Sequence, residues 1–260
     1  MVNVEPKQYF RFLLDSFYPP FCVLCGAISH GGFPHCCDDC YRSFQRLHGG
    51  ICSICGKPFP VDDHPHPCLE CIGNPPPYSW CRALYLYSGR LAEAVSLLKY
   101  RRKMSLLDVV MSAAVEAIGD IHVPEADLVV PVPTVFTRLM RRGFNQASVL
   151  ARPLAEGLGI VMLPEALKRV KGRPQVGLDM ADRAANVRGA FVPGRDYREL
   201  DGKRVLVFDD VYTSGATVKE CSRVIGRIAS GVSVLTLARA GGPESPGNFA
   251  VNQTVGSEDP

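Results

Sequence analysis

The chain has 260 residues, of which 47% are hydrophobic and 21% charged, with a formal net charge of +3. This ordinary globular composition excludes a disordered tail protein, a collagen-like repeat and an isolated zinc finger. No apolar run approaches the roughly 20 residues that a membrane-spanning helix needs, and the N-terminus lacks the layout of a signal peptide. We therefore expect a cytoplasmic protein without a membrane span.

Charge is distributed unevenly along the chain. Residues 1–80 carry 5 Lys or Arg against 7 Asp or Glu, whereas residues 81–240 carry 24 against 16 and so have a net charge of +8. A basic domain of this kind suggests an anionic ligand, either phosphates or nucleic acid, and charge alone does not choose between them. The acidic charge of the N-terminal part favours its docking on the basic domain of the same chain.

Ten of the eleven cysteines lie between Cys22 and Cys81, and eight of these form four Cys-x-x-Cys pairs. Two thiolates two residues apart can bind one tetrahedral ion from a tight turn, and a second pair closes the site. The spacing predicts two structural zinc sites, because four thiolates leave no open position for a substrate. The expected ligands of the first ion are Cys22, Cys25, Cys37 and Cys40, and those of the second are Cys52, Cys55, Cys68 and Cys71.

Alternatives to these ligand sets remain open at this point. Cys36 could replace Cys37, and a histidine among His35, His64 and His66 could replace a cysteine. Disulfides would need an oxidising compartment, and four evenly spaced pairs exceed what a redox site requires. Four prolines predict short hairpins rather than helices between the pairs, and we expect Cys81 and Cys221 to be ordinary buried thiols.

The sequence divides into three parts. Residues 1–78 are expected to form the double zinc ribbon with a short N-terminal helix, ending in the linker Gly-Asn-Pro-Pro-Pro-Tyr at 73–78. Residues 79–240 form the larger domain. Residues 241–260 are rich in Gly, Pro, Ser and Asn, and we expect a disordered tail there.

The larger domain alternates apolar strands with amphipathic helices, which predicts an α/β fold with a parallel sheet covered on both faces. The expected strands cover Arg82–Tyr87, Asp127–Val132, Lys203–Phe208 and Val232–Leu237. The expected helices cover Leu91–Tyr100, Leu106–Ile118, Gln146–Leu158 and Ala216–Ser230.

The most informative segment is Val-Leu-Val-Phe-Asp-Asp-Val-Tyr-Thr-Ser-Gly-Ala-Thr at residues 205–217. A buried strand delivers Asp209 and Asp210 at its carboxyl end, where open α/β sheets bind ligands. The following loop and helix N-terminus form a cradle for an anion, made by Thr213, Ser214, Gly215, Ala216 and Thr217. Together these parts suit a ribose 5-phosphate. An ordinary strand-end turn and N-cap is the alternative, but this combination of residues is rarer than either.

This segment resembles the phosphoribosyl-pyrophosphate (PRPP) motif of type I phosphoribosyltransferases. Two Cys-x-x-Cys ribbons followed by Leu-Lys-Tyr, Pro-Val-Pro, Arg-Arg-Gly-Phe-Asn-Gln and this motif resemble the ComF family over residues 18–240. The resemblance implies a double zinc ribbon followed by a Rossmann-like type I phosphoribosyltransferase domain with a mainly parallel sheet. The family includes proteins needed for natural competence.

The resemblance also implies residue roles. Asp209 and Asp210 would hold the ribose hydroxyls, and the loop that follows would hold the 5-phosphate. Pyrophosphate would bind at the loop of Val132, Pro133 and Thr134, with its charge neutralised by Arg138, Arg141 and Arg142. Asn145 and Gln146 would either orient the substrate or cap the next helix. Lys99 would be either a ligand-binding residue or part of a solvated basic surface.

The segment Lys168–Phe191 corresponds to the mobile loop over the active site of the family, with Arg169 and Lys171 as catalytic candidates beside the two aspartates. It departs from the family pattern at residues 172–175, where a Thr usually precedes the Gln. In the chemistry that the family implies, pyrophosphate leaves the anomeric carbon of PRPP while a nucleophile attacks, with Mg²⁺ between the pyrophosphate and the ribose hydroxyls.

Three hypotheses on function follow. The first is a phosphoribosyltransferase with an unknown acceptor, which binds PRPP or a related ribose phosphate. The second is a sensing module that binds PRPP or a nucleotide without turnover. The third is a factor that handles single-stranded DNA or contacts DNA-uptake machinery, for which steep salt dependence of binding would be the mark.

Overall fold

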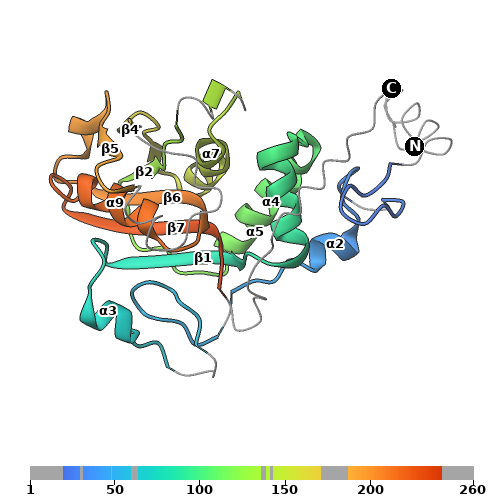
Figure 1. Ribbon diagram of the computed structural model, residues 1–260, viewed down its shortest axis with the longest axis horizontal. Coiled ribbons are helices and arrows are strands. Elements are labelled where there is room, and N and C mark those ends of the chain that lie inside the picture. Colours follow the sequence, from blue (N-terminus) through green and yellow to red (C-terminus); the bar gives the residue numbers. More distant parts are fainter. Residues whose placement is uncertain are drawn as a thin grey trace, which may run out of the picture.

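The computed structural model describes residues 20–29, 32–47, 49–59, 64–135, 139–140, 143–170 and 187–241. An α/β domain makes up most of these residues. Figure 1 shows the cysteine-rich ribbon with α3 alongside strand β1 and the one with α2 beyond the end of that strand. The predicted N-terminal helix and nearly all of the predicted tail lie outside the described residues.

The main sheet has five strands in the order β1-β7-β6-β2-β3, and every neighbouring pair is parallel. The strands are β1 (Trp80–Leu86), β2 (Leu128–Pro131), β3 (Val161–Met162), β6 (Arg204–Tyr212) and β7 (Gly231–Arg239). The central strand β6 is buried from Val205 to Phe208, as expected for a parallel strand covered on both faces. The predicted α/β fold class is therefore confirmed.

Helices pack on both faces of this sheet. On one face α4 (Gly89–Arg101), the 3-10 turn Met104–Leu106, α5 (Leu107–Ile118) and α7 (Gln146–Leu158) form one core with Leu206 and Phe208. On the other face α9 (Ala216–Ile225) forms a second core with Val205 and Val207. None of the helices in the described ranges is long and apolar enough to cross a membrane.

The two central strands are longer than predicted. The prediction ended a strand at Phe208, but β6 continues through both aspartates to Tyr212 because its ladder with β7 continues there, with Asp209 opposite Thr236. The carboxylates therefore lie within the last part of β6 and not beyond its end. Helix α9 is shorter than predicted, ending at Ile225 rather than Ser230, because Gly226 ends it and the chain turns into β7.

Three very short strands escaped prediction. β3 has two residues, and β4 (Leu167–Arg169) and β5 (Phe191–Pro193) have three each, too few to show a period of two. The pair β4 and β5 forms a separate antiparallel sheet, with Arg169 opposite Phe191. A 3-10 turn, Tyr197–Leu200, leads from it toward β6.

The ribbons are built alike, and their short helices begin within the second cysteine pairs, whereas the hairpin prediction concerns the segments between the pairs. The first cysteine pair of each ribbon lies in a turn closed by an antiparallel bridge, Phe21 with Ile28 and Ile51 with Pro58. The second pair lies at the start of a short helix, α2 (Asp38–Arg42) or α3 (Leu69–Gly73). A helix brings side chains three residues apart to the same side, so it presents two thiols as well as a turn does.

The chain between the ribbons and the first turn of the second ribbon cover the outer edge of β1. Arg46 bridges Tyr85 in antiparallel fashion, Leu86 N donates to Gln45 O at 2.8 Å, and Cys81 N donates to Ile54 O at 2.7 Å. These bonds satisfy backbone groups that would otherwise form an exposed sheet edge. The ribbons contact the domain through these backbone bonds, through apolar packing and through ion pairs such as Glu70 with Lys219 and Arg46 with Glu116. Cys81 and Cys221 are buried, as predicted.

Candidate functional site

The predicted ligand loops follow neighbouring strands. β6 pairs with β2, and from β2 the chain passes through α7 to β3 on one side, whereas from β6 it passes through α9 to β7 on the other. Beyond the β2 ladder, Val132 N still donates to Phe208 O at 2.8 Å. The loops after β2 and β6 therefore flank the point where the strand order diverges, which is where doubly wound sheets bind ligands.

The acidic pair on β6 meets a lysine from α4. Lys99 Nζ lies 2.9 Å from Asp210 Oδ2, and the two side chains are only 16% and 15% exposed. Burial works against the lysine charge, but the carboxylates of Asp210 and Asp209 outweigh it and raise the pKa of Lys99. Lys99 therefore packs against the acidic pair and is not a solvated surface lysine, which agrees with its predicted place beside the ligand.

Asp209 has an unusual proton affinity. Burial and the neighbouring charge of Asp210 raise the pKa of Asp209 to about 7, against the lowering effects of the Asp210 N–H, Lys99 and Arg169. The Asp210 N–H donates to Asp209 Oδ1 at 2.9 Å. A cation or hydroxyl donors bound at this carboxyl group would stabilise its ionised form.

Arg169 comes close to the pair from outside the main sheet. It ends β4, its guanidinium lies 5.1 Å from the centre of the Phe191 ring, and its charge lowers the pKa of Asp209. The structure therefore brings Arg169 toward the aspartates, as its predicted role requires. Lys171, its predicted companion, lies outside the described residues.

The predicted phosphate loop leads directly into α9. Gly215 has a φ of +72° and is the N-cap residue of the helix. A Cβ on this residue would overlap the ring and hydroxyl of Tyr212, so the position requires glycine. The Ser214 hydroxyl accepts a long hydrogen bond of 3.4 Å from Ala216 N. Thr213 is exposed, whereas Ser214 and Thr217 are half-buried.

The loop after β2 is held from the start of α7. Asn145 Nδ2 donates to Val132 O at 3.1 Å and to Ser148 Oγ at 2.9 Å, and its side chain makes no cap bond to the helix backbone. Asn145 therefore fixes the predicted pyrophosphate loop of Val132, Pro133 and Thr134. Gln146 is buried, with neither amide atom hydrogen-bonded to the described residues. The predicted Arg138, Arg141 and Arg142 lie outside the described residues.

The eight paired cysteines form two clusters with the predicted membership, and in each cluster all ligand atoms lie within 4.8 Å of one another. Cys25 Sγ and Cys37 Sγ are 3.6 Å apart, and Cys55 Sγ and Cys68 Sγ are 3.8 Å apart. Sulfurs around a tetrahedral zinc, each about 2.3 Å from the metal, are about 3.8 Å apart. The clusters therefore fit zinc without Cys36 or a histidine.

One thiol in each cluster is prepared for ionisation. Burial opposes the charge, but backbone N–H groups lower the pKa of Cys52 to about 6, and Cys22 is affected in the same way. Two of these donors are Cys55 N at 3.4 Å and Cys68 N at 3.2 Å from Cys52 Sγ. Such N–H donors stabilise the thiolate that a metal binds.

Three residues near the site were missed from the sequence. Arg239 at the end of β7 donates to Cys55 O at 2.8 Å and stacks on Tyr212, whose hydroxyl contacts that of Tyr78 at 3.0 Å. Tyr212 lies within the motif that follows the aspartates, which is the one signal that could have drawn attention to it. For Arg239 and Tyr78 the sequence holds no such signal, since only the fold brings them together.

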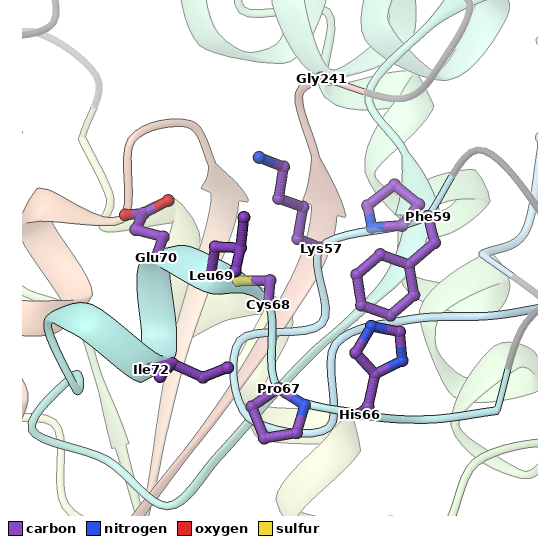
Figure 2. A pocket seen from close by; sticks show the side chains of 10 residues that line it. Lys57, Phe59, His66, Pro67, Cys68, Leu69, Glu70, Ile72 and Gly241 are labelled. Atoms are coloured by element: carbon purple, nitrogen blue, oxygen red, sulfur yellow. The ribbon is translucent and has the colours of Figure 1, made fainter.

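A separate apolar groove of about 570 Å³ lies on the second ribbon (Figure 2). Phe59 and His66 stack there with ring centres 4.3 Å apart, and Leu69 and Ile72 of α3 are exposed beside them. Apart from Cys68, none of the predicted site residues lines this groove.

Comparisons with known proteins cover both the cysteine-rich ribbons and the larger domain. The family model of the double zinc ribbon domain matches residues 13–72. The DNA utilization protein YhgH of Salmonella typhi is 32% identical over 231 residues, which cover 85% of this chain and 97% of that protein. Competence protein F of Haemophilus influenzae is 31% identical over 227 residues, which cover 78% of this chain and 96% of that protein. The chain belongs to the ComF family.

Among solved structures, the ComF chain is similar to the glutamine PRPP amidotransferase of B. subtilis complexed with ADP and GMP. The match has 21% identity and a TM-score of 0.39, and it covers 55% of this chain and 30% of the other. A match of this level gives no information on activity.

Proposed function

We propose that this ComF-family chain is a phosphoribosyltransferase-type protein that binds PRPP together with Mg²⁺ between the ends of β2 and β6. One observation carries the proposal. A half-buried acidic pair, held by Lys99 at 2.9 Å, precedes a glycine-kinked loop at the N-terminus of α9 and lies beside the anchored loop after β2. A sugar bearing phosphates at both ends matches this order of carboxylates between two loops.

Each part of the site has a role in this proposal. The 5-phosphate binds at Thr213–Thr217, where the helix N-terminus offers N–H donors and a favourable dipole. The ribose hydroxyls donate to Asp209 and Asp210, and pyrophosphate lies at the loop that Asn145 anchors through Val132 O. Lys99 and Arg169 compensate the charge of the aspartates, so that the site accepts an anionic ligand.

The donor set also fits a hard cation. The carboxylates of Asp209 and Asp210 are oxygen ligands of the kind Mg²⁺ prefers, directly or through water. When bound, Mg²⁺ supplies neutralisation of the pyrophosphate charge. In the transfer step the bond between the anomeric carbon and pyrophosphate breaks and a bond to the acceptor forms, while the chain's own groups orient the ribose and hold the leaving group.

A role in the handling of DNA is the second candidate function. It is favoured by the names of the relatives, a DNA utilization protein and a competence protein, and by the net charge of +8 in residues 81–240. Either function is proposed to take place in the cytoplasm, where the eight cysteines stay reduced and available to metal.

Calorimetric titration of the zinc-loaded full chain with PRPP, with and without Mg²⁺, tests the proposal. We expect saturable one-to-one binding that depends on Mg²⁺, and its loss in the double variant Asp209→Asn/Asp210→Asn. Asp108→Asn, at an exposed position on α5, is the matched control and should bind as the wild type does.

An absence of binding at millimolar PRPP would overturn the proposal. Single-stranded DNA is then the ligand to titrate, and binding that weakens steeply with added salt would identify the second function. The double variant separates the two functions, because loss of two carboxylates abolishes PRPP binding but leaves the binding of a polyanion intact or stronger.

A further inference from the structure

Several bonds join the turn of the second ribbon to the main sheet. Arg82 and Cys81 N of β1 donate to carbonyls of this turn, and a buried arginine of β7 donates to it as well. Arg239 ends β7, is only 8% exposed, and donates from Nη1 to the carbonyl oxygen of Cys55 at 2.8 Å. This carbonyl belongs to the turn that presents Cys52 and Cys55 to the metal position. The same guanidinium lowers the pKa of the Cys55 thiol, against the larger effect of burial, so it also lies close enough to compensate the charge of the cluster.

The same guanidinium stacks on the residue that supports the phosphate loop. Its central carbon lies 4.1 Å from the centre of the Tyr212 ring, and the two residues are opposite each other in the ladder of β6 and β7. The Tyr212 hydroxyl lies 3.0 Å from that of Tyr78, and burial raises the pKa of Tyr212 to about 12. Tyr212 is therefore a neutral ring clamped between an arginine and a second tyrosine.

The phosphate loop rests on this ring. Gly215 contacts Tyr212 so closely that no side chain fits between them, and its φ of +72° sets the direction in which α9 begins. A shift of the Tyr212 ring would change the position of the first N–H groups of α9. A second link runs in parallel, because Glu70 of α3 pairs with Lys219 of α9 at 3.3 Å.

We infer that Arg239 and Tyr212 are positioning residues that couple metal binding at the second cysteine cluster to the conformation of the phosphate loop. The part that concerns PRPP rests on the proposed function; the coupling itself does not. A metal that orders the Cys52–Cys55 turn fixes the carbonyl to which Arg239 donates, and through the Tyr212 ring this fixes the loop. Coupling is reciprocal, so a ligand at the loop must also tighten metal binding at the second cluster.

The first cluster provides the internal control. Arg90 Nη1 donates to Leu24 O at 2.6 Å, in the turn between Cys22 and Cys25, as Arg239 does in the second ribbon. Arg90 is at the start of α4, is 41% exposed and pairs with Glu93 at the surface. These partners of Arg90 lie away from β6. Arg90→Met therefore removes the same kind of hydrogen bond as Arg239→Met, but no contact with Tyr212.

Hydrogen exchange of the full zinc-loaded chain tests the coupling without a ligand. We expect the amide hydrogens of residues 213–219 to exchange at least tenfold faster in Arg239→Met than in the wild type. In Arg90→Met their exchange should be unchanged. Arg239→Lys serves as a milder second variant, because a lysine keeps the charge but loses the stacked, forked geometry. Equal exchange in all four proteins, each with two bound zinc ions by elemental analysis, would overturn the inference.

Addition of PRPP with Mg²⁺ then separates the two proposals. If PRPP slows metal release to a chelator from the second cluster, and Arg239→Met abolishes this protection, the coupling extends to the ligand. If PRPP binds by calorimetry but protects both clusters equally or neither, the inference is wrong while the proposed function stands. If PRPP does not bind but residues 213–219 exchange faster in Arg239→Met, the proposed function is wrong while the coupling stands.

Discussion

The two cysteine clusters have the same local construction but different surroundings. In each, a turn and the start of a short helix supply four sulfurs within 4.8 Å, and an arginine donates to a carbonyl of the turn. The first cluster has an exposed cysteine, Cys25, and packs in the core shared with α4 and α5. The second has four buried cysteines and packs in the core shared with α9 and Tyr212. Figure 1 shows α2 and α3 well apart, toward the two ends of β1.

Two metal sites with the same ligands can therefore have different effects on the rest of one chain. The chemistry of each site is fixed by the sulfur ligands, but its effect on the rest of the molecule depends on what the neighbouring arginine touches next. Arg90 reaches a surface glutamate, whereas Arg239 reaches the ring under the phosphate loop.

Substitution of one cysteine ligand should give the largest effect, and the loss of thermal stability should differ between the two clusters. Cys52→Ser should release one metal and destabilise the fold by several kcal/mol, because structural zinc contributes about 10 kcal/mol to the folding of small zinc domains. Cys25→Ser should release one metal with a smaller loss of thermal stability, since Cys25 is exposed. Elemental analysis and melting curves measure both, and equal losses would contradict the distinction.

Removal of one partner of the buried ion pair should affect the ligand site next. Asp210→Asn leaves Lys99 without the carboxylate at 2.9 Å, and it removes a proposed contact of the ribose. An unpaired charge at a buried position is costly, so we expect stability to fall by about 3 kcal/mol. We also expect PRPP affinity to fall about a hundredfold, equivalent to the roughly 3 kcal/mol of one charged hydrogen bond. Calorimetry that gives wild-type affinity would refute the role of Asp210.

A methyl group on the phosphate loop should weaken binding less. Gly215→Ala places a Cβ against Tyr212 and forces an alanine into a left-handed φ, so the start of α9 must shift. We expect a loss of about tenfold in PRPP affinity, of the order of the 1–2 kcal/mol that a non-glycine residue costs in this region. Gly202→Ala, which also has a positive φ but open space around its Cβ, is the matched control for strain alone.

The titration of Asp209 should be visible as a pH dependence of stability rather than as a loss of binding. An unfolded aspartate loses its proton near pH 3.9, whereas Asp209 in the folded chain keeps it up to a pKa of about 7. Between these values the folded state binds more protons, so the free energy of unfolding falls as pH rises toward 7. Urea unfolding at pH 5 and pH 8 should show a larger fall in the wild type than in Asp209→Asn. Parallel profiles would show that Asp209 does not titrate in this range.

Much of this arrangement follows from the sequence, for reasons that differ between regions. The cysteine spacing predicts both clusters because a metal site is a local pattern, and α7 occupies the predicted Gln146–Leu158 because its apolar period is regular. β3, β4 and β5 are too short to carry a pattern. The extension of β6 through Asp209 and Asp210 depends on its pairing with β7 and not on its own residues.

The candidate site likewise contains residues that a local pattern predicts and residues that only the fold brings together. The acidic pair and the loop are predictable because they are consecutive, whereas the sequence allows two interpretations of Lys99 and only the packing of α4 brings it against Asp210. In the sequence, Arg239 lies 27 residues after Tyr212, and Tyr78 lies 134 residues before it. Their meeting at Tyr212 is a property of the sheet order alone, and no local pattern records it.

The most direct test of the account is cadmium-113 NMR of the full chain with cadmium in place of zinc. The two four-thiolate clusters should give two resonances, which Arg90→Met and Arg239→Met assign by shifting one each. Saturation with PRPP and Mg²⁺ should then move the resonance of the second cluster and leave that of the first in place. If neither resonance moves, or if that of the first cluster moves instead, the second cluster is not joined to the ligand site as described.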